Sequence, residues 1–131
     1  MAQQAVPVKK SNGYELSSLK GQVMGIDPEK GGRITLLSID GKNFLTDSLV
    51  NKDNWGSTFW PSPQSDWNWP PPAAWDNQPY TVQLEGNRIK MQGGVDSKSG
   101  LAVTKIFSAD VTKGFYELEY VITNQSALVK R

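Results

Sequence analysis

The side chains best suited to recognise a small molecule lie within residues 54–80, which contain all five tryptophans and six of the eight prolines. Indole faces stack on the apolar C–H faces of sugar rings, and interleaved amides and carboxylates can bind the sugar hydroxyls. Because this segment alternates the two kinds of side chain, it predicts a carbohydrate-binding platform. The expected contact residues within it are Trp60, Gln64, Asp66, Trp67, Asn68, Trp69 and Trp75.

The same segment also has a structural interpretation, which the sequence leaves open. Proline fixes φ and lacks a backbone N–H, so residues 48–79 should form a long ordered loop and not a central strand or a helix. Their many aromatic side chains argue against disorder. Such a loop could instead fold over one end of the protein, where its tryptophans would serve as hydrophobic core.

The amino-acid composition excludes several classes of function. The chain has no cysteine and no histidine, which excludes disulfide scaffolds, zinc fingers, thiol catalysis and histidine-based triads. A total of 14 basic against 13 acidic residues gives a net charge of +1, so nothing points to nucleic acid. Apolar runs fall short of the ~18 residues that cross a bilayer. We expect no metal, cofactor, nucleic-acid or membrane partner, and we can name no catalytic residue.

Short strands separated by tight turns must position this loop. Alternating apolar residues predict strands at 13–19, 21–26, 33–39, 43–46, 80–85, 88–92, 101–109 and 115–123. Asp40-Gly41 favours a type I′ turn between the third and fourth of these. No stretch sustains helical spacing, so we predict an all-β fold, an antiparallel β-sandwich. Lys105, in the middle of a strand, is expected to extend to solvent.

Several short motifs follow one another along the chain. They are Gly31-Gly32-Arg33-Ile34, Asn54-Trp55-Gly56-Ser57, Trp60-Pro61-Ser62-Pro63-Gln64, Trp69-Pro70-Pro71-Pro72, Thr104-Lys105 and Tyr120-Val121-Ile122-Thr123-Asn124. Together they resemble a bacterial protein family of unknown function with a galactose-mutarotase-like supersandwich. The resemblance covers roughly residues 20–126, nearly the whole chain, and only the N-terminal half of the family domain.

The resemblance implies that Arg33 contributes to a sugar site, so it joins the predicted contact residues. Aldose epimerases of this fold use a histidine acid and a glutamate base. This chain has no histidine, and the corresponding glutamate would lie beyond residue 131, so no catalytic residue carries over. We therefore expect non-catalytic carbohydrate recognition. The alternatives are part of an aldose-epimerase-like sugar-modifying enzyme and a purely structural domain with a buried tryptophan loop.

These interpretations make residues 1–131 a single β-sandwich domain, or the N-terminal half of a larger and here truncated one, with a polar tail at 1–12 and a Trp/Pro-rich loop at 48–79. In the second case the strand near 115–123 would have an unpaired edge, which would pair with a second copy or with the missing C-terminal half. Met1-Ala2-Gln3-Gln4 fits a mature chain that follows a small-residue cleavage site, which favours a bacterial periplasmic or secreted protein. An ordinary polar tail fits equally well.

Overall fold

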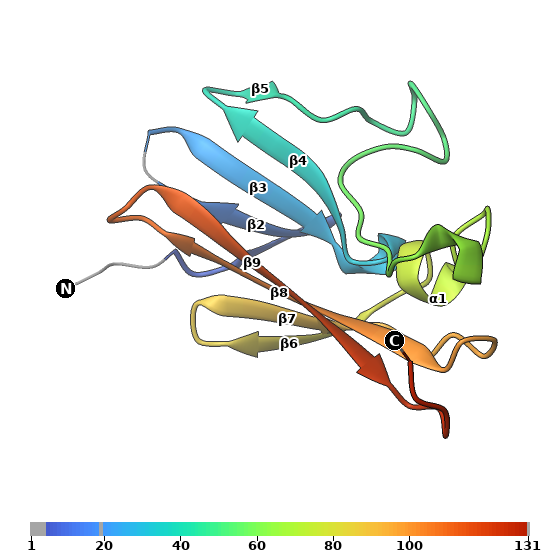
Figure 1. Cartoon of the computed structure of the whole chain (residues 1–131). Helices are drawn as coiled ribbons and strands as arrows, with labels where there is room; N and C mark the ends of the chain where they lie inside the picture. Colours follow the sequence, from blue (N-terminus) through green and yellow to red (C-terminus); the bar gives the residue numbers. More distant parts are fainter. Residues whose placement is uncertain (1–4, 19, 131) are drawn as a thin grey trace.

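The computed structural model describes residues 5–18 and 20–130 and consists of two antiparallel β-sheets (Figure 1). The first sheet has the strand order β1-β2-β3-β4-β5, and the second has the order β6-β7-β8-β9. The first comprises β1 (Val8–Lys10), β2 (Gly13–Ser17), β3 (Gln22–Asp27), β4 (Arg33–Ile39) and β5 (Lys42–Asn43). The second comprises β6 (Thr81–Glu85), β7 (Arg88–Gln92), β8 (Leu101–Asp110) and β9 (Phe115–Asn124). The predicted all-β class and antiparallel pairing are confirmed.

Both sheets contribute to one hydrophobic core, as in a β-sandwich. Its buried side chains come from β2, β3 and β4 on one side and from β7 and β8 on the other, together with Tyr80, which directly precedes β6. They are Leu16, Met24, Ile26, Ile34, Tyr80, Ile89, Met91, Phe107 and Ala109. Because each strand alternates its side chains between two faces, every second residue of these strands reaches this core.

Tight turns join the strands within each sheet. Asp40 and Gly41 both adopt positive φ, 51° and 82°, between β4 and β5, as the predicted type I′ turn requires. The longest hairpin, β8–β9, pairs continuously from Leu101 opposite Asn124 to Asp110 opposite Phe115. The other strands predicted from alternation and turn residues are confirmed within the described residues, with shifts of a few residues at the ends, whereas the strand predicted at 43–46 shares only Asn43 with β5.

The tryptophan loop, residues 48–79, belongs to the connection from the first sheet to the second. It lies at one end of the molecule, beside the β3–β4 connection that contains the 3₁₀ helix η1 (Pro28–Lys30) (Figure 1). The loop itself contains a 3₁₀ turn, η2 (Gln64–Asp66), and a single α-helical turn, α1 (Ala73–Asp76). The expectation of no helix was therefore slightly wrong, because a proline is tolerated just before a helical turn, where no N–H is needed.

The position of Lys105 differs from a second expectation, that its side chain extends to solvent. It lies in β8 on the same face as Val103, Phe107 and Ala109, all of them buried, and its side chain is only 2% exposed. The period of two along β8 therefore directs the lysine into the interior, and not to solvent as the sequence analysis expected.

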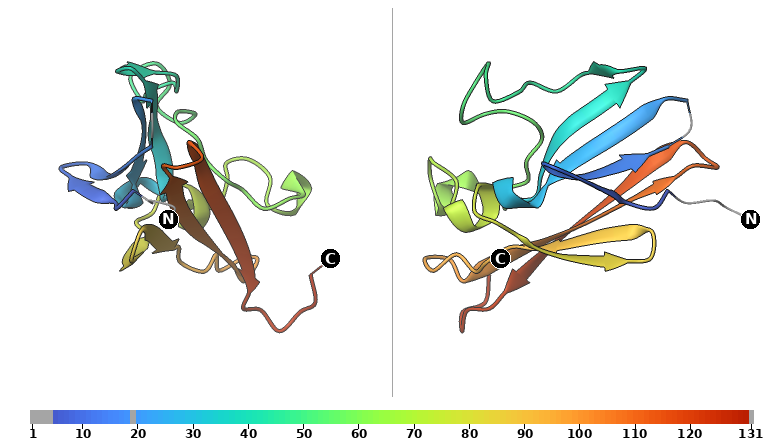
Figure 2. Two further views of the ribbon diagram at one scale, coloured as in Figure 1. Left: turned by 90° about the vertical axis from the view of Figure 1, so that its left-hand side faces the viewer. Right: turned by 180° about the vertical axis from the view of Figure 1, so that it is seen from behind.

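Strand β9 forms one edge of the second sheet (Figure 2). Among the described residues it pairs with β8 and with no other strand. Its exposed large apolar side chains are Phe115, Leu118, Val121 and Ile122. A long apolar edge of this kind offers free backbone N–H and C=O groups to a further strand.

The N-terminal region departs from the predicted polar tail at 1–12. Residues 8–10 form β1, which pairs with β2 through Val8 opposite Glu15, although all three residues are exposed. Residues 1–4 of the expected tail, and residue 19 at the end of the expected first strand, lie outside the described residues. Within the described residues, no helix has the length and apolar character that a bilayer crossing needs.

Candidate functional site

Gly31 and Gly32 bring the β3–β4 connection down onto the second sheet. Both have positive φ, 74° and 62°, and a Cβ on Gly31 would overlap the main-chain oxygen of Asp76. Their carbonyl groups accept hydrogen bonds from the Lys105 ammonium, with Nζ 2.9 Å from Gly31 O and 3.5 Å from Gly32 O. The glycine pair, singled out as a sequence motif, thus lets a buried lysine join the two sheets.

The Lys105 ammonium is buried, and burial favours its neutral form. Its Nζ is 5.2 Å from the centre of the Tyr80 ring. Burial lowers the pKa of Lys105 from 10.5 to about 8, with Asp76 opposing the change and Arg33 adding to it. Burial, followed by the charge of Asp76, raises the pKa of the Tyr80 phenol, whose hydroxyl donates to Trp75 O at 2.6 Å. Lys105 is therefore held mainly by carbonyl groups and an aromatic ring.

Arg33, the first residue of β4, ties the tryptophan loop to the sheet. Its Nη1 donates to the main-chain oxygens of Asp53, at 3.3 Å, and Trp55, at 3.2 Å. Its Nη2 donates to the main-chain oxygen of Asp76, at 3.3 Å, and to Asp76 Oδ1, at 3.1 Å. The guanidinium carbon lies 4.7 Å from the centre of the Trp55 ring, and the residue is 3% exposed. Arg33 therefore holds both ends of the loop.

Asp76, in α1, is the anionic partner of this arginine. Besides the Arg33 ion pair, its Oδ1 accepts a hydrogen bond from Trp60 Nε1 at 2.8 Å. Its side chain is about nine-tenths buried, at 11% exposure. The carboxylate is thus already bound to two donors of the same chain, which fits an anchoring role.

Four of the tryptophans pack edge to face in a row. Ring centres are 5.7 Å apart for Trp69 and Trp60, 5.9 Å for Trp60 and Trp67, and 6.2 Å for Trp67 and Trp75. Trp67 Nε1 donates to Pro61 O at 2.8 Å, and Trp75 Nε1 donates to Leu101 O at 3.0 Å. Trp75 is 1% exposed, so its expected role in stacking a sugar is corrected to that of a core residue.

The outer end of this row borders an open hollow of about 870 Å³, here called the Trp69 hollow. Trp69 is 54% exposed there, and Trp55 is half-buried. Two segments of the loop line it, together with Lys30 of η1 and Arg33 at the start of β4. Its lining includes Lys30, Arg33, Ser48, Lys52, Asp53, Trp55, Trp69, Pro70, Pro71, Pro72, Asp76 and Asn77.

The predicted contact residues do not form one site. Arg33 and Trp69 line the Trp69 hollow, although the Nη1 and Nη2 donors of Arg33 are already bound to the loop and only its buried Nε has no partner among the described residues. Asp66, Trp67 and Trp75 border a separate hollow of about 370 Å³ beside Leu101. The remaining three, Trp60, Gln64 and Asn68, line neither of these two hollows.

Sequence reasoning missed several residues of the hollow. Lys30, Lys52, Trp55 and Asn77 line it and were not predicted as contacts. Trp55 lies in the tryptophan-rich segment and could have been included on that ground. The two lysines lie outside that segment and carried no signal of their own, because only the folded chain brings η1 and the start of the loop together.

Comparison with known proteins identifies no relative: no protein-family model matches the chain, and no curated protein or solved structure is detectably similar. Among the described residues, no three Asp or Glu side chains gather as metal ligands would. The chemistry available in the Trp69 hollow consists of aromatic faces, ammonium groups, carboxylates and amides. Side chains of these kinds are the ones that bind and orient polar ligands in the pockets of other proteins.

Proposed function

We propose that this protein binds carbohydrate in the Trp69 hollow. The observation that carries the proposal is the position of Trp69, which is 54% exposed at the edge of an open hollow and is supported from behind by Trp60. An indole in edge-to-face contact with a neighbouring ring and followed by Pro70-Pro71-Pro72 needs little ordering when a sugar binds against it. Rigid aromatic surfaces are also a common feature of binding sites.

Polar groups around the indole could bind the sugar hydroxyls. Ser48, Lys52, Asp53 and Asn77 line the hollow and are all exposed. A hydroxyl, an amide, an ammonium and a carboxylate together supply both donors and acceptors. Because the hollow is open and carries few aromatic faces, a free sugar should bind in about the millimolar to high micromolar range.

The test is an NMR titration of the ¹⁵N-labelled protein with a panel of neutral mono- and oligosaccharides. We expect the indole N–H signal of Trp69 and the side-chain amide of Asn77 to shift, and W69A to weaken binding about fivefold or more. The matched control is F44A, which removes an exposed aromatic side chain directly after β5 and outside the hollow. Unchanged spectra across the whole panel would remove the proposal.

A specific observation also favours a structural role for the loop. The indole N–H groups of Trp60, Trp67 and Trp75 all donate within the chain, so most of the tryptophan row stabilises the loop itself. In this second candidate function the loop is a scaffold. No saccharide would then bind, and W69A would change stability without changing any ligand affinity.

The finer assignment to a galactose-mutarotase-like half-domain belongs to the same proposal. Its support is the free edge of β9, at which further strands of a larger sandwich would pair. Membership in a sugar-modifying enzyme would depend on catalytic residues outside this chain. Co-expression with a candidate C-terminal half, followed by co-purification, tests this assignment directly, and failure of V121K to disturb the complex would count against pairing at β9.

A further inference from the structure

We infer that the Trp69 hollow prefers acidic carbohydrates, such as uronic acids, to the neutral sugars with the same ring. This inference rests on the proposed function and names its ligand class. It follows from the ionic groups that the fold brings to the hollow. These are three cations, Lys30, Arg33 and Lys52, and two anions, Asp53 and Asp76.

Two of these five charges cancel within the protein. Arg33 and Asp76 form a buried ion pair, with Nη2 3.1 Å from Oδ1, and their remaining contacts hold the loop. The charges left to act on a ligand are therefore the ammonium groups of Lys30 and Lys52 and the carboxylate of Asp53, a net charge of +1. All three residues are exposed.

Neither lysine forms an ion pair with a carboxylate in the part of the chain that the structure describes. Among residues 5–18 and 20–130, the ion pairs are Arg33 with Asp76, and Arg88 and Lys90 with Glu85. Lys30 also borders a second hollow that Asp27 lines, and its charge acts on the Asp27 carboxylate without a direct ion pair among the described residues. Each lysine therefore keeps its three N–H donors for solvent or for a ligand.

The geometry joins this positive charge to an aromatic wall. A uronic acid keeps the apolar ring face of the neutral sugar and adds one carboxylate at C6, so it can stack on Trp69 and meet an ammonium group at the same time. A neutral sugar can only stack and form neutral hydrogen bonds. Solvent-exposed ion pairs are individually weak, so the preference should be about twofold to fivefold at low salt. It should largely disappear at about 0.5 M NaCl.

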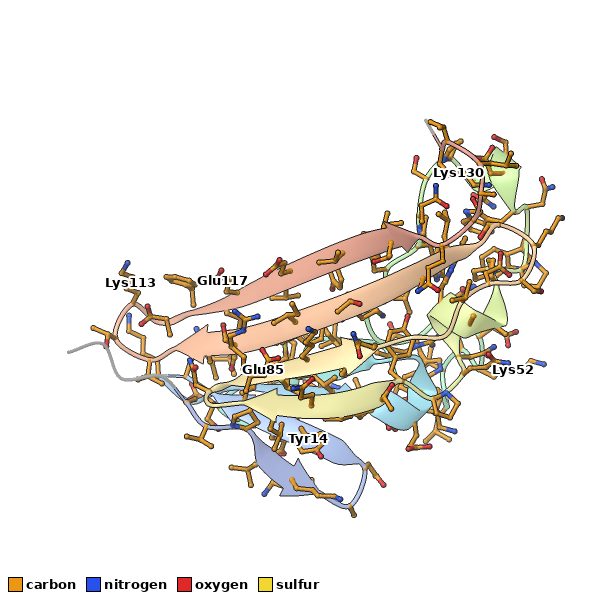
Figure 3. The ribbon with its side chains drawn as sticks, turned by 90° about the horizontal axis from the view of Figure 1, so that it is seen from below. Tyr14, Lys52, Glu85, Lys113, Glu117 and Lys130 are labelled. Carbon is orange, nitrogen blue, oxygen red and sulfur yellow. The ribbon has the colours of Figure 1, made fainter. Side chains whose placement is uncertain are left out.

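The experiment compares methyl glucuronide with methyl glucoside, and methyl galacturonide with methyl galactoside, by NMR titration of the full chain. The test variant is K30Q/K52Q. The matched control is K42Q/K113Q, which removes the same charge at the other end of the molecule; Figure 3 shows Lys52 and Lys113 at opposite ends. We expect the wild type and the control to prefer the acidic sugar, and K30Q/K52Q, which leaves only the Asp53 carboxylate beside the ligand, to bind the acidic sugar no more tightly than the neutral one.

The outcomes separate this inference from the proposed function. Equal binding of acidic and neutral sugars by the wild type overturns the acidic preference and leaves sugar binding intact. A preference that survives in K30Q/K52Q, or that K42Q/K113Q removes equally well, also overturns it, because the two lysines would not be its source. Absence of binding by every sugar overturns both proposals.

Discussion

Lys105 makes the stability of this protein depend on pH in an unusual direction. Its pKa is about 8 in the folded state, against an ordinary value of 10.5, because burial disfavours the ammonium. Between these two values the unfolded chain binds more protons than the folded one, so the free energy of unfolding rises with pH. The destabilisation by the buried charge is complete below about pH 8 and is relieved above it. Linkage between the two pKa values gives an increase of about 2 kcal/mol from about pH 7 to about pH 9.5.

The assay is urea denaturation followed by tryptophan fluorescence at these two pH values. The variant K105M keeps a side chain of similar length without the charge, so its stability should not show this increase. K90M, which removes a lysine from β7 that reaches Glu85 at 4.0 Å, is the matched control and should keep the wild-type increase. Higher pH is avoided because burial raises the pKa of Tyr80, Tyr116 and Tyr120, so their unfolded-state ionisation lowers stability above about pH 10.

The reasoning would be refuted if wild-type stability stayed constant or fell between the two pH values. It would also be refuted if K105M kept the full increase. In the first case the ammonium would be as well stabilised by the Gly31 and Gly32 carbonyls and the Tyr80 ring as it is by water. In the second case another group would be responsible for the pH dependence.

The remaining predictions concern the anchoring of the loop and the sheet edge. G31A should lower the free energy of unfolding by roughly 2 kcal/mol or more because its Cβ meets the Asp76 main chain. G86A, also at positive φ but in open space, should cost only about 1 kcal/mol in the same denaturation assay. R33A and D76N should each lower the free energy of unfolding by about 3–5 kcal/mol, because each leaves a buried charge without its partner. The double variant should lose less than the sum of the two, and additive losses would mean that the two residues are not coupled. The free edge of β9 predicts self-association that V121K abolishes, and a wild type that sediments as a monomer at all concentrations would contradict it.

Much of the fold could be predicted because its signals are local. The Asp40-Gly41 turn and the alternation in β6 to β9 depend on residues close in sequence, and the structure confirms both. The same alternation indicated that Lys105 faces the core, because Lys105 lies two residues from Val103 and two from Phe107 on the same face of β8. The general tendency of lysine to reach solvent was given more weight than its position in the strand, and this produced the error.

The candidate site was harder to predict because it depends on distant contacts. The composition of residues 54–80 located the aromatic surface, but it could not separate exposed Trp69 from buried Trp75. That difference depends on Leu101, which accepts the Trp75 indole N–H. Likewise, the sequence singled out Arg33 as a candidate site residue. It could not show that Arg33 contacts Asp53, Trp55 and Asp76.

The sequence alone determined the all-β class, the hairpins and the concentration of tryptophan and proline in one loop, because period, turn chemistry and composition act over a few residues. The tertiary structure decided which indole faces solvent, which charges cancel and which lysines remain free beside the Trp69 hollow. The physical reason is that burial and ion pairing depend on the neighbours in space, and here those neighbours come from η1, β4, the tryptophan loop and β8.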